Sequence, residues 1–156
     1  MRNSPYIVLV CLLISVSSCA QKAAKIKSSG KSVIISKAAP QPIGPYSQAV
    51  AANGFLFVSG QIGSNPQTRK LVTESFEAET IQVMENLKAI LQQAGVDFQE
   101  VVKATIYLKD INQFARVNEI YGRYFSTAPP ARETVQVANL PGNANIEISV
   151  IAVLPK

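Results

Sequence analysis

The sequence predicts an α+β fold in which two helices cover one face of a mixed β-sheet. One segment repeats apolar residues with a helical period, and a second begins at a capping pair and ends at two prolines. Six short runs with strand patterns surround them, in the order β-β-β-α-β-α-β-β. The 156 residues fit one compact domain with short extensions. Helices on one face leave the other face of the sheet open, so we expect self-association to bury it.

Three strands are expected before the first helix. A β-branched run predicts the first strand, and the prolines and glycine that follow it break any ladder. Asn53-Gly54 tolerates the positive φ of a type I′ turn and therefore predicts a hairpin. The expected strands are 33–35, 48–52 and 55–59, with a break at 39–45 and a loop at 60–67.

The first helix is expected from about Phe76 to Ala94, where apolar residues recur at steps of three and four. Its N-terminal region carries Glu74, Glu77 and Glu79, where the helix dipole favours anions, and Gly95 can end it. The stripe predicts core packing.

The second half of the chain predicts three strands and one helix. Asp110 with Gln113 can cap a helix that runs to about Phe125, and Pro129-Pro130 stops it. In the last strand Ile146 and Ile148 share one face, and Glu147 lies on the other. The expected strands are 101–108, 133–138 and 146–153.

Composition excludes several kinds of chemistry. The chain has no histidine, which removes histidine bases and the usual zinc sites, so no metal site is expected. Both cysteines, Cys11 and Cys19, precede the domain, so no catalytic thiol is expected within it. The net charge of +5 comes largely from lysines between positions 22 and 31, which disfavours a nucleic-acid partner.

The N-terminus predicts export and a lipid anchor. A basic start precedes an apolar run at 6–16, about half of the ~20 residues that a transmembrane helix needs. Val16-Ser17-Ser18-Cys19 resembles a bacterial lipobox, with Val16 where leucine is usual. We expect a signal peptide at 1–18, a lipidated Cys19 with a flexible basic linker at 19–31, and the domain at 32–156. The protein would be a membrane-anchored lipoprotein on the periplasmic or outer-membrane side; the alternative is an ordinary signal peptide cut nearby, with Cys19 incidental.

Five motifs within the domain resemble those of Rid (YjgF-type) proteins in order and spacing. They are Ile43-Gly44-Pro45-Tyr46-Ser47-Gln48-Ala49-Val50, Val58-Ser59-Gly60-Gln61-Ile62, Val117-Asn118-Glu119-Ile120-Tyr121, Pro130-Ala131-Arg132 and Ile146-Glu147-Ile148. The resemblance implies a chorismate-mutase-like α+β fold and a homotrimer with three clefts between subunits. It also implies hydrolysis of 2-aminoacrylate-type enamines, or of their 2-imino acid tautomers such as 2-iminopropanoate and 2-iminobutanoate, to 2-oxo acids and ammonia. No cofactor is implied.

The resemblance assigns catalytic roles to two residues. Arg132 would bind the substrate carboxylate through its guanidinium fork. Glu147 would orient water for attack on the imine carbon, and partial burial would disfavour its charged form. The alternatives are a structural salt bridge for Arg132 and an outward-facing sheet residue for Glu147. The deaminase hypothesis requires both side chains, from adjacent strand segments, to reach one pocket at a subunit boundary.

The resemblance adds substrate-binding residues, each of which could instead serve packing, capping or a tight turn. Thr134 stands where the best-studied members have cysteine, and Ser149 stands where many have a second glutamate, which bears on substrate range and rate. Besides Arg132, the candidate substrate-binding residues are Tyr46, Ser59, Gly60, Asn118 and Thr134.

Two other functions remain open at this point. The first is a non-catalytic carboxylate-binding or holdase module on the same scaffold, which would bind ligands without releasing ammonia. The second is RNA cleavage or translation inhibition, which the absence of histidine and of a basic-aromatic platform disfavours.

Overall fold

The computed structural model describes residues 30–125 and 127–155, so the expected signal peptide, Cys19 and most of the linker lie outside the described residues. Six strands and two helices follow the predicted order, with short 3-10 turns before β4, α2 and β6. The elements are β1 (Ser32–Ile34), β2 (Ala49–Ala52), β3 (Phe55–Ile62), α1 (Phe76–Gln93), β4 (Val101–Leu108), α2 (Phe114–Tyr124), β5 (Ala131–Gln136) and β6 (Ile146–Val153).

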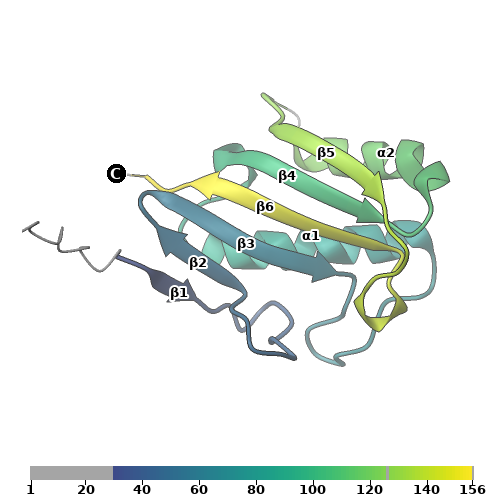
Figure 1. Cartoon of the computed structure of the whole chain (residues 1–156), viewed down its shortest axis with the longest axis horizontal. Coiled ribbons are helices and arrows are strands. Elements are labelled where there is room, and N and C mark those ends of the chain that lie inside the picture. Colours follow the sequence, from purple (N-terminus) through teal and green to yellow (C-terminus); the bar gives the residue numbers. More distant parts are fainter. Residues whose placement is uncertain (1–29, 126, 156) are drawn as a thin grey trace, which may run out of the picture.

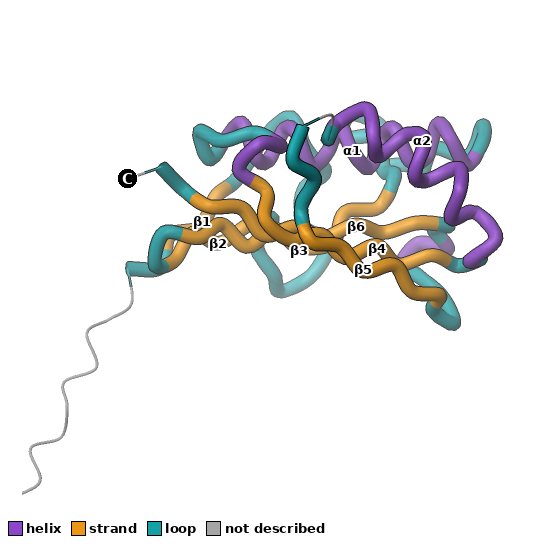
Figure 2. The backbone as a smooth tube through the Cα atoms, turned by 90° about the horizontal axis from the view of Figure 1, so that it is seen from above, coloured by secondary structure: helices purple, strands orange, loops and turns teal. Residues whose placement is uncertain are grey.

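The strands form one mixed sheet in the order β1-β2-β3-β6-β4-β5. Neighbouring strands are antiparallel except β4 and β5, which are parallel because α2 connects them. Both helices lie on the same side of the sheet, and the other side is uncovered (Figures 1 and 2). The predicted mixed sheet with two helices on one face is confirmed.

The core lies between α1 and the centre of the sheet. Val83, Leu87 and Ile90 on the predicted apolar stripe of α1 are fully buried. Ser75 caps the helix by accepting a hydrogen bond from the Ala78 amide, and Gly95 adopts a φ of 78° directly after Ala94. The sequence pattern therefore predicted both the buried face and the ends of this helix.

Two strand boundaries differ from the prediction. The expected loop begins at Gly60, but β3 continues to Ile62 because its pairing with β6 resumes after a register shift between Val58 and Gln61. The fifth strand was expected at 133–138, and β5 instead spans Ala131–Gln136. It starts directly after the two prolines because Ala131 already lies opposite Lys103 of β4.

The capping pair expected at the second helix is half correct. Asp110 accepts a hydrogen bond from the Asn112 amide and so opens the 3-10 turn Ile111–Gln113, which leads into α2. The side chain of Gln113 does not accept a hydrogen bond from the Asp110 amide, because its oxygen accepts one from Arg116 instead. The helix start was predicted correctly, and its reciprocal cap was not.

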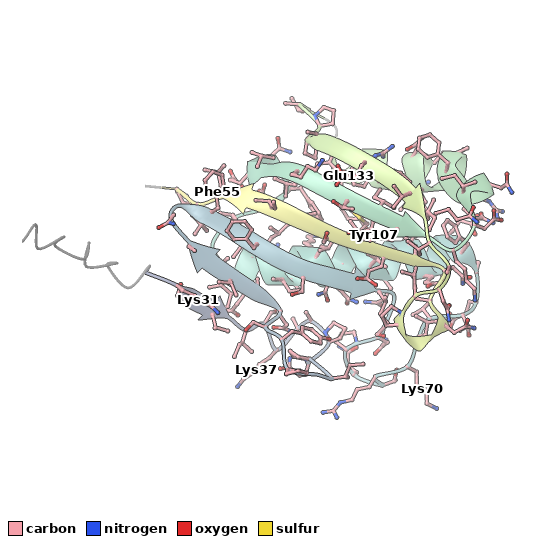
Figure 3. The ribbon with its side chains drawn as sticks, viewed as in Figure 1. Lys31, Lys37, Phe55, Lys70, Tyr107 and Glu133 are labelled. Atoms are coloured by element: carbon pink, nitrogen blue, oxygen red, sulfur yellow. The ribbon has the colours of Figure 1, made fainter. Side chains whose placement is uncertain are left out.

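The uncovered face of the sheet carries large apolar side chains. Phe55 and Phe57 of β3 are 42% and 46% exposed, and Val135 of β5 is 42% exposed. Figure 3 shows Phe55, Tyr107 and Glu133 on this face, turned toward the viewer and away from the helices. A monomer rarely leaves so many apolar groups in water, so this face is suited to burial against another surface. Within residues 30–125 and 127–155, no helix has the length and apolarity needed to span a bilayer.

Candidate functional site

Arg132 points from β5 toward the helix side of the sheet. It lies opposite Ala104 of β4, which is fully buried under the helices, and paired residues of neighbouring strands face the same side. Its Nη2 donates a 2.7 Å hydrogen bond to Oδ1 of Asn118 on α2. Among the described residues no carboxylate oxygen lies within 4.0 Å of its guanidinium, so the alternative of a structural salt bridge is not observed in one chain.

Two aromatic rings of α2 frame the Arg132 guanidinium. Its Cζ lies 5.0 Å from the ring centroid of Tyr121 and 5.5 Å from that of Phe114, distances typical of cation–π contacts. Phe114, Asn118 and Tyr121 are spaced at i, i+4 and i+7, so one face of α2 presents all three. We call Arg132, Asn118, Phe114, Tyr121 and Thr134 the arginine half-site.

Two buried hydroxyl groups in this half-site have no hydrogen-bond partner among the described residues. They are Oη of Tyr121 and Oγ1 of Thr134, which lies two residues from Arg132 on the same face of β5. Burial raises the pKa of Tyr121 to about 12, against a smaller opposing effect of the Arg132 charge. Tyr121 therefore stays neutral in the physiological range and offers an uncharged hydroxyl beside the guanidinium.

Glu147 lies on the opposite face of the sheet, in a cavity of about 400 Å³. Its strand neighbours Ile146 and Ile148 are fully buried toward the helices, and Glu147 alternates with them. Burial raises the pKa of Glu147, and no described residue donates a hydrogen bond to it. The cavity, which we call the glutamate pocket, is lined by Ile43, Gly44, Tyr46, Ser59, Gly60, Ile62, Pro141 and Glu147.

Gly60 makes room for the Glu147 carboxylate. A Cβ atom built on Gly60 would lie 1.8 Å from Oε1 of Glu147 and 2.7 Å from its Cδ, far inside van der Waals contact. The carboxylate thus lies directly against the β3 backbone. Any side chain at position 60 would have to move it.

Ser59 and Tyr46 join the loop before β2 to the glutamate pocket. The Ser59 hydroxyl donates a 2.7 Å hydrogen bond to the Ser47 carbonyl, so its proton is engaged within the chain. Tyr46 is 50% exposed, and its hydroxyl accepts a long 3.5 Å hydrogen bond from the Ile43 amide. Tyr46 therefore forms an open wall of the pocket, while Ser59 fixes the backbone beneath it.

A single chain does not bring Arg132 and Glu147 together. We expected them to reach one pocket at a subunit boundary from adjacent strand segments. The segments are not adjacent, because β4 lies between β5 and β6, and the two side chains lie on opposite faces of the sheet. The described cavity around Glu147 contains no residue of the arginine half-site. The adjacency of the segments was wrong, and a shared pocket at a subunit boundary stays a prediction. The predicted roles of the site residues remain predictions.

Sequence reasoning treated the remaining candidates as one set, which the structure divides between the two half-sites, and it missed some neighbours. Tyr46, Ser59 and Gly60 lie with Glu147, whereas Asn118 and Thr134 lie with Arg132. Phe114 and Tyr121 were not assigned to the site. Their spacing from Asn118 on a helix could have identified them.

The described residues offer no obvious metal centre. Within 30–125 and 127–155, no three His, Cys, Asp or Glu side chains gather closely enough to hold a metal ion.

Comparisons with known proteins agree with this fold. The family model described as "Endoribonuclease L-PSP" matches residues 36–154. The chain is 51% identical over 124 residues to "Reactive Intermediate Deaminase A, chloroplastic" of Arabidopsis thaliana, covering 80% of this chain and 66% of that protein.

Solved structures are similar over the same domain. YyfA of Yersinia pestis, a Rid family protein described as of unknown function, is 50% identical with a TM-score of 0.78, over 80% of this chain and 99% of that one. TdcF of E. coli, solved with bound serine, is 37% identical with a TM-score of 0.76, over 80% and 99%. The family model covers β2 to β6 and both helices. The chain belongs to the Rid/YjgF (RutC, L-PSP) family.

Proposed function

We propose that this protein is a hydrolytic deaminase of 2-enamine and 2-imino acids of the 2-aminoacrylate, 2-iminopropanoate and 2-iminobutanoate class. The products are a 2-oxo acid and ammonia, and no cofactor takes part. The observation that carries the proposal is a guanidinium oriented by Asn118 and facing no carboxylate among the described residues. A free, oriented guanidinium is suited to a carboxylate ligand.

The substrate carboxylate would bind at the arginine half-site. Arg132 uses one of its N–H groups on Asn118, which leaves others for a bidentate contact with a carboxylate. The rings of Phe114 and Tyr121 limit the positions that the guanidinium can take. Structural comparison adds support, since the related TdcF binds serine, which also carries a carboxylate.

Glu147 would orient the attacking water. Its carboxylate projects into a largely apolar cavity with free acceptor positions, so a water molecule can donate a hydrogen bond to it. The raised pKa makes Glu147 a stronger base than an exposed glutamate once it is ionised. It can therefore accept a proton from water and release it to nitrogen.

The reaction balances with water as the one co-reactant. The enamine tautomerises to the imine, and water adds to the C=N carbon while its proton passes through Glu147 to the nitrogen. In the resulting carbinolamine the hydroxyl proton is transferred to the nitrogen, the C–N bond breaks as the C=O bond forms, and the nitrogen departs as ammonia. Binding both reactants side by side is the main contribution of the protein, because free imines also hydrolyse in water.

A complete site requires more than one chain, and we propose a homotrimer. Arg132 and Glu147 lie on opposite faces of one sheet, so the arginine half-site of one copy would face the glutamate pocket of a neighbour across each of three clefts. The exposed apolar residues of the uncovered face, including Phe55 and Phe57, supply the surface for such an assembly. Light scattering coupled to size-exclusion chromatography tests this stoichiometry.

Ammonia release from freshly generated 2-iminobutanoate tests the activity. The purified domain should accelerate release over buffer, and Arg132→Ala should remove the acceleration while the oligomer persists. Wild-type rates from Arg132→Ala would refute the carboxylate anchor. Binding of a carboxylate ligand without any accelerated release would instead support the non-catalytic binding or holdase module.

We also propose that the protein is exported and anchored in a membrane by a lipid on Cys19, on the periplasmic or outer-membrane side. The support is the apolar run at 6–16 and the lipobox-like Val16-Ser17-Ser18-Cys19. Globomycin, which blocks cleavage of lipoprotein signal peptides, should cause the full-length precursor to accumulate. An unchanged mature band would overturn the lipid anchor.

A further inference from the structure

Glu79 on α1 is a buried carboxylate that the proposed reaction does not use. It is 1% exposed, and no Lys or Arg of the described chain lies within 4.0 Å of it. A buried carboxylate is costly unless hydrogen bonds replace its water. Its surroundings therefore have to explain why it is there.

Both oxygens of Glu79 accept hydrogen bonds from one residue. Oε1 accepts the backbone amide of Asn145 at 2.8 Å, and Oε2 accepts its side-chain Nδ2 at 2.7 Å. Two bonds from one carboxylate fix the orientation as well as the position of Asn145. Asn145 directly precedes β6, and Glu147 is two residues further along.

The same helix also fixes the strand that pairs with Glu147. Nδ2 of Asn86, one to two turns after Glu79, donates to the carbonyls of Ile62 at 3.1 Å and Ser64 at 2.9 Å. Between these two carbonyls Gly63 allows close approach, since a Cβ there would lie 2.5 Å from Cγ of Glu79. Ile62 is the β3 partner of Glu147 in the sheet.

The hydrogen bonds of Glu79 thus hold the start of β6, and those of Asn86 hold the end of β3. These two strand ends form the glutamate pocket, and both are held from the helix side of the sheet. We infer that Glu79 is a positioning residue, whose hydrogen bonds to Asn145 fix the start of β6 and so determine where the Glu147 carboxylate lies. The inference rests on the proposed function for its kinetic readout. Its structural readout, the titration of Glu147, does not.

Substitutions at Glu79 separate position from charge. Glu79→Gln removes the charge but can keep both contacts: its Oε1 accepts the Asn145 amide, and its Nε2 donates to Asn145 Oδ1 once that side-chain amide turns over. Glu79→Ala removes both contacts. Thr80→Val is the matched control, because Thr80 is also fully buried on α1 and, among the described residues, its hydroxyl bonds only to Phe76 O at 2.8 Å.

We expect Glu79→Ala to lower kcat for imine hydrolysis on the order of tenfold, with KM changed less than about twofold, since in the described chain Glu79 makes no contact with the arginine half-site that binds the carboxylate. Carbon-13 NMR should detect the Glu147 pKa moving down toward its ordinary range, because a loosened carboxylate gains water. Two titratable groups of the described chain face Glu147. Tyr46 lines the same pocket, and Tyr107 lies opposite Glu147 on β4. Glu79→Gln and Thr80→Val should retain wild-type kcat and the raised Glu147 pKa.

Four outcomes bear on the inference. Wild-type kcat and Glu147 pKa in Glu79→Ala would overturn it. An equal pKa drop in Glu79→Gln would also overturn it, because loss of charge would then be the cause.

Asn145→Ala is the fallback if Glu79→Ala does not assemble, because it removes one of the two hydrogen bonds at an exposed residue. It should lower kcat about threefold and shift the Glu147 pKa in the same direction. An inactive wild-type protein in which Glu79→Ala still shifts the Glu147 pKa would refute the proposed function and leave the positioning role intact.

Discussion

Gly60→Ala tests whether the position of the Glu147 carboxylate governs activity. The new Cβ would lie 1.8 Å from Glu147 Oε1, whereas ordinary contacts begin at 3.4 Å, so the oxygen has to move by about 1.6 Å. The carboxylate is the end of a flexible side chain beside a cavity of about 400 Å³ and can move. Gly60 does not need a positive φ, so alanine fits its backbone. We expect a stability cost below about 1 kcal/mol.

The expected effect on catalysis is much larger. A displacement above 1 Å of a group that orients a reactant lowers the rate on the order of 100-fold. The assay is kcat/KM for 2-iminobutanoate hydrolysis, measured beside Tm on the same preparation. Gly122→Ala is the control, because a Cβ atom at position 122 meets nothing within 4 Å. Gly122 lies in α2, where alanine favours the helix. A Gly60→Ala protein with wild-type kcat/KM would refute the assigned role of Glu147.

Three further predictions concern charge and burial. Burial raises the pKa of Glu147 in the folded chain above its unfolded value. The protonated form therefore stabilises the fold. This stabilisation is complete below the unfolded pKa and is lost as the pH rises through the folded pKa. Glu147→Gln should therefore match the wild-type Tm in acid and exceed it at neutral pH; an equal Tm at both would contradict this. Arg132→Lys should raise KM about tenfold with kcat little changed, because an ammonium cannot form the bidentate contact, and steady-state kinetics measure both values. Tyr121→Phe removes a buried hydroxyl without a described partner, so chemical denaturation should give equal or slightly higher stability, and a loss above about 1 kcal/mol would reveal a partner across the oligomer.

Local chemistry in the sequence was sufficient to predict most elements. The apolar stripe from Phe76, the Asn53-Gly54 turn and the Pro129-Pro130 stop each act within a few residues, so their effects are visible in the sequence. The extension of β3 to Ile62 depends instead on a distant strand, because pairing with β6 continues beyond the register shift.

The arrangement of the candidate site was predicted only in part, for the same reason. Which face a strand residue occupies depends on the register of its whole sheet. Arg132 faces the helices because it pairs with Ala104, and Glu147 faces away because it pairs with Tyr107. The alternation in Ile146-Glu147-Ile148 did predict that Glu147 lies on the face opposite the isoleucines, but nothing in Pro130-Ala131-Arg132 shows that Arg132 faces the helices. The motifs identified the residues, and the sheet separates them.

The separation of the two half-sites on opposite faces has a genetic consequence. Arg132→Ala and Glu147→Ala should each be inactive alone, yet a mixture of the two, unfolded and reassembled together, should regain about a quarter of the wild-type turnover, since one cleft in four would pair an intact arginine with an intact glutamate. Two defective alleles in one cell would then complement each other. Mutations in this chain should accordingly fall into two complementation groups, divided by which side of the sheet they affect.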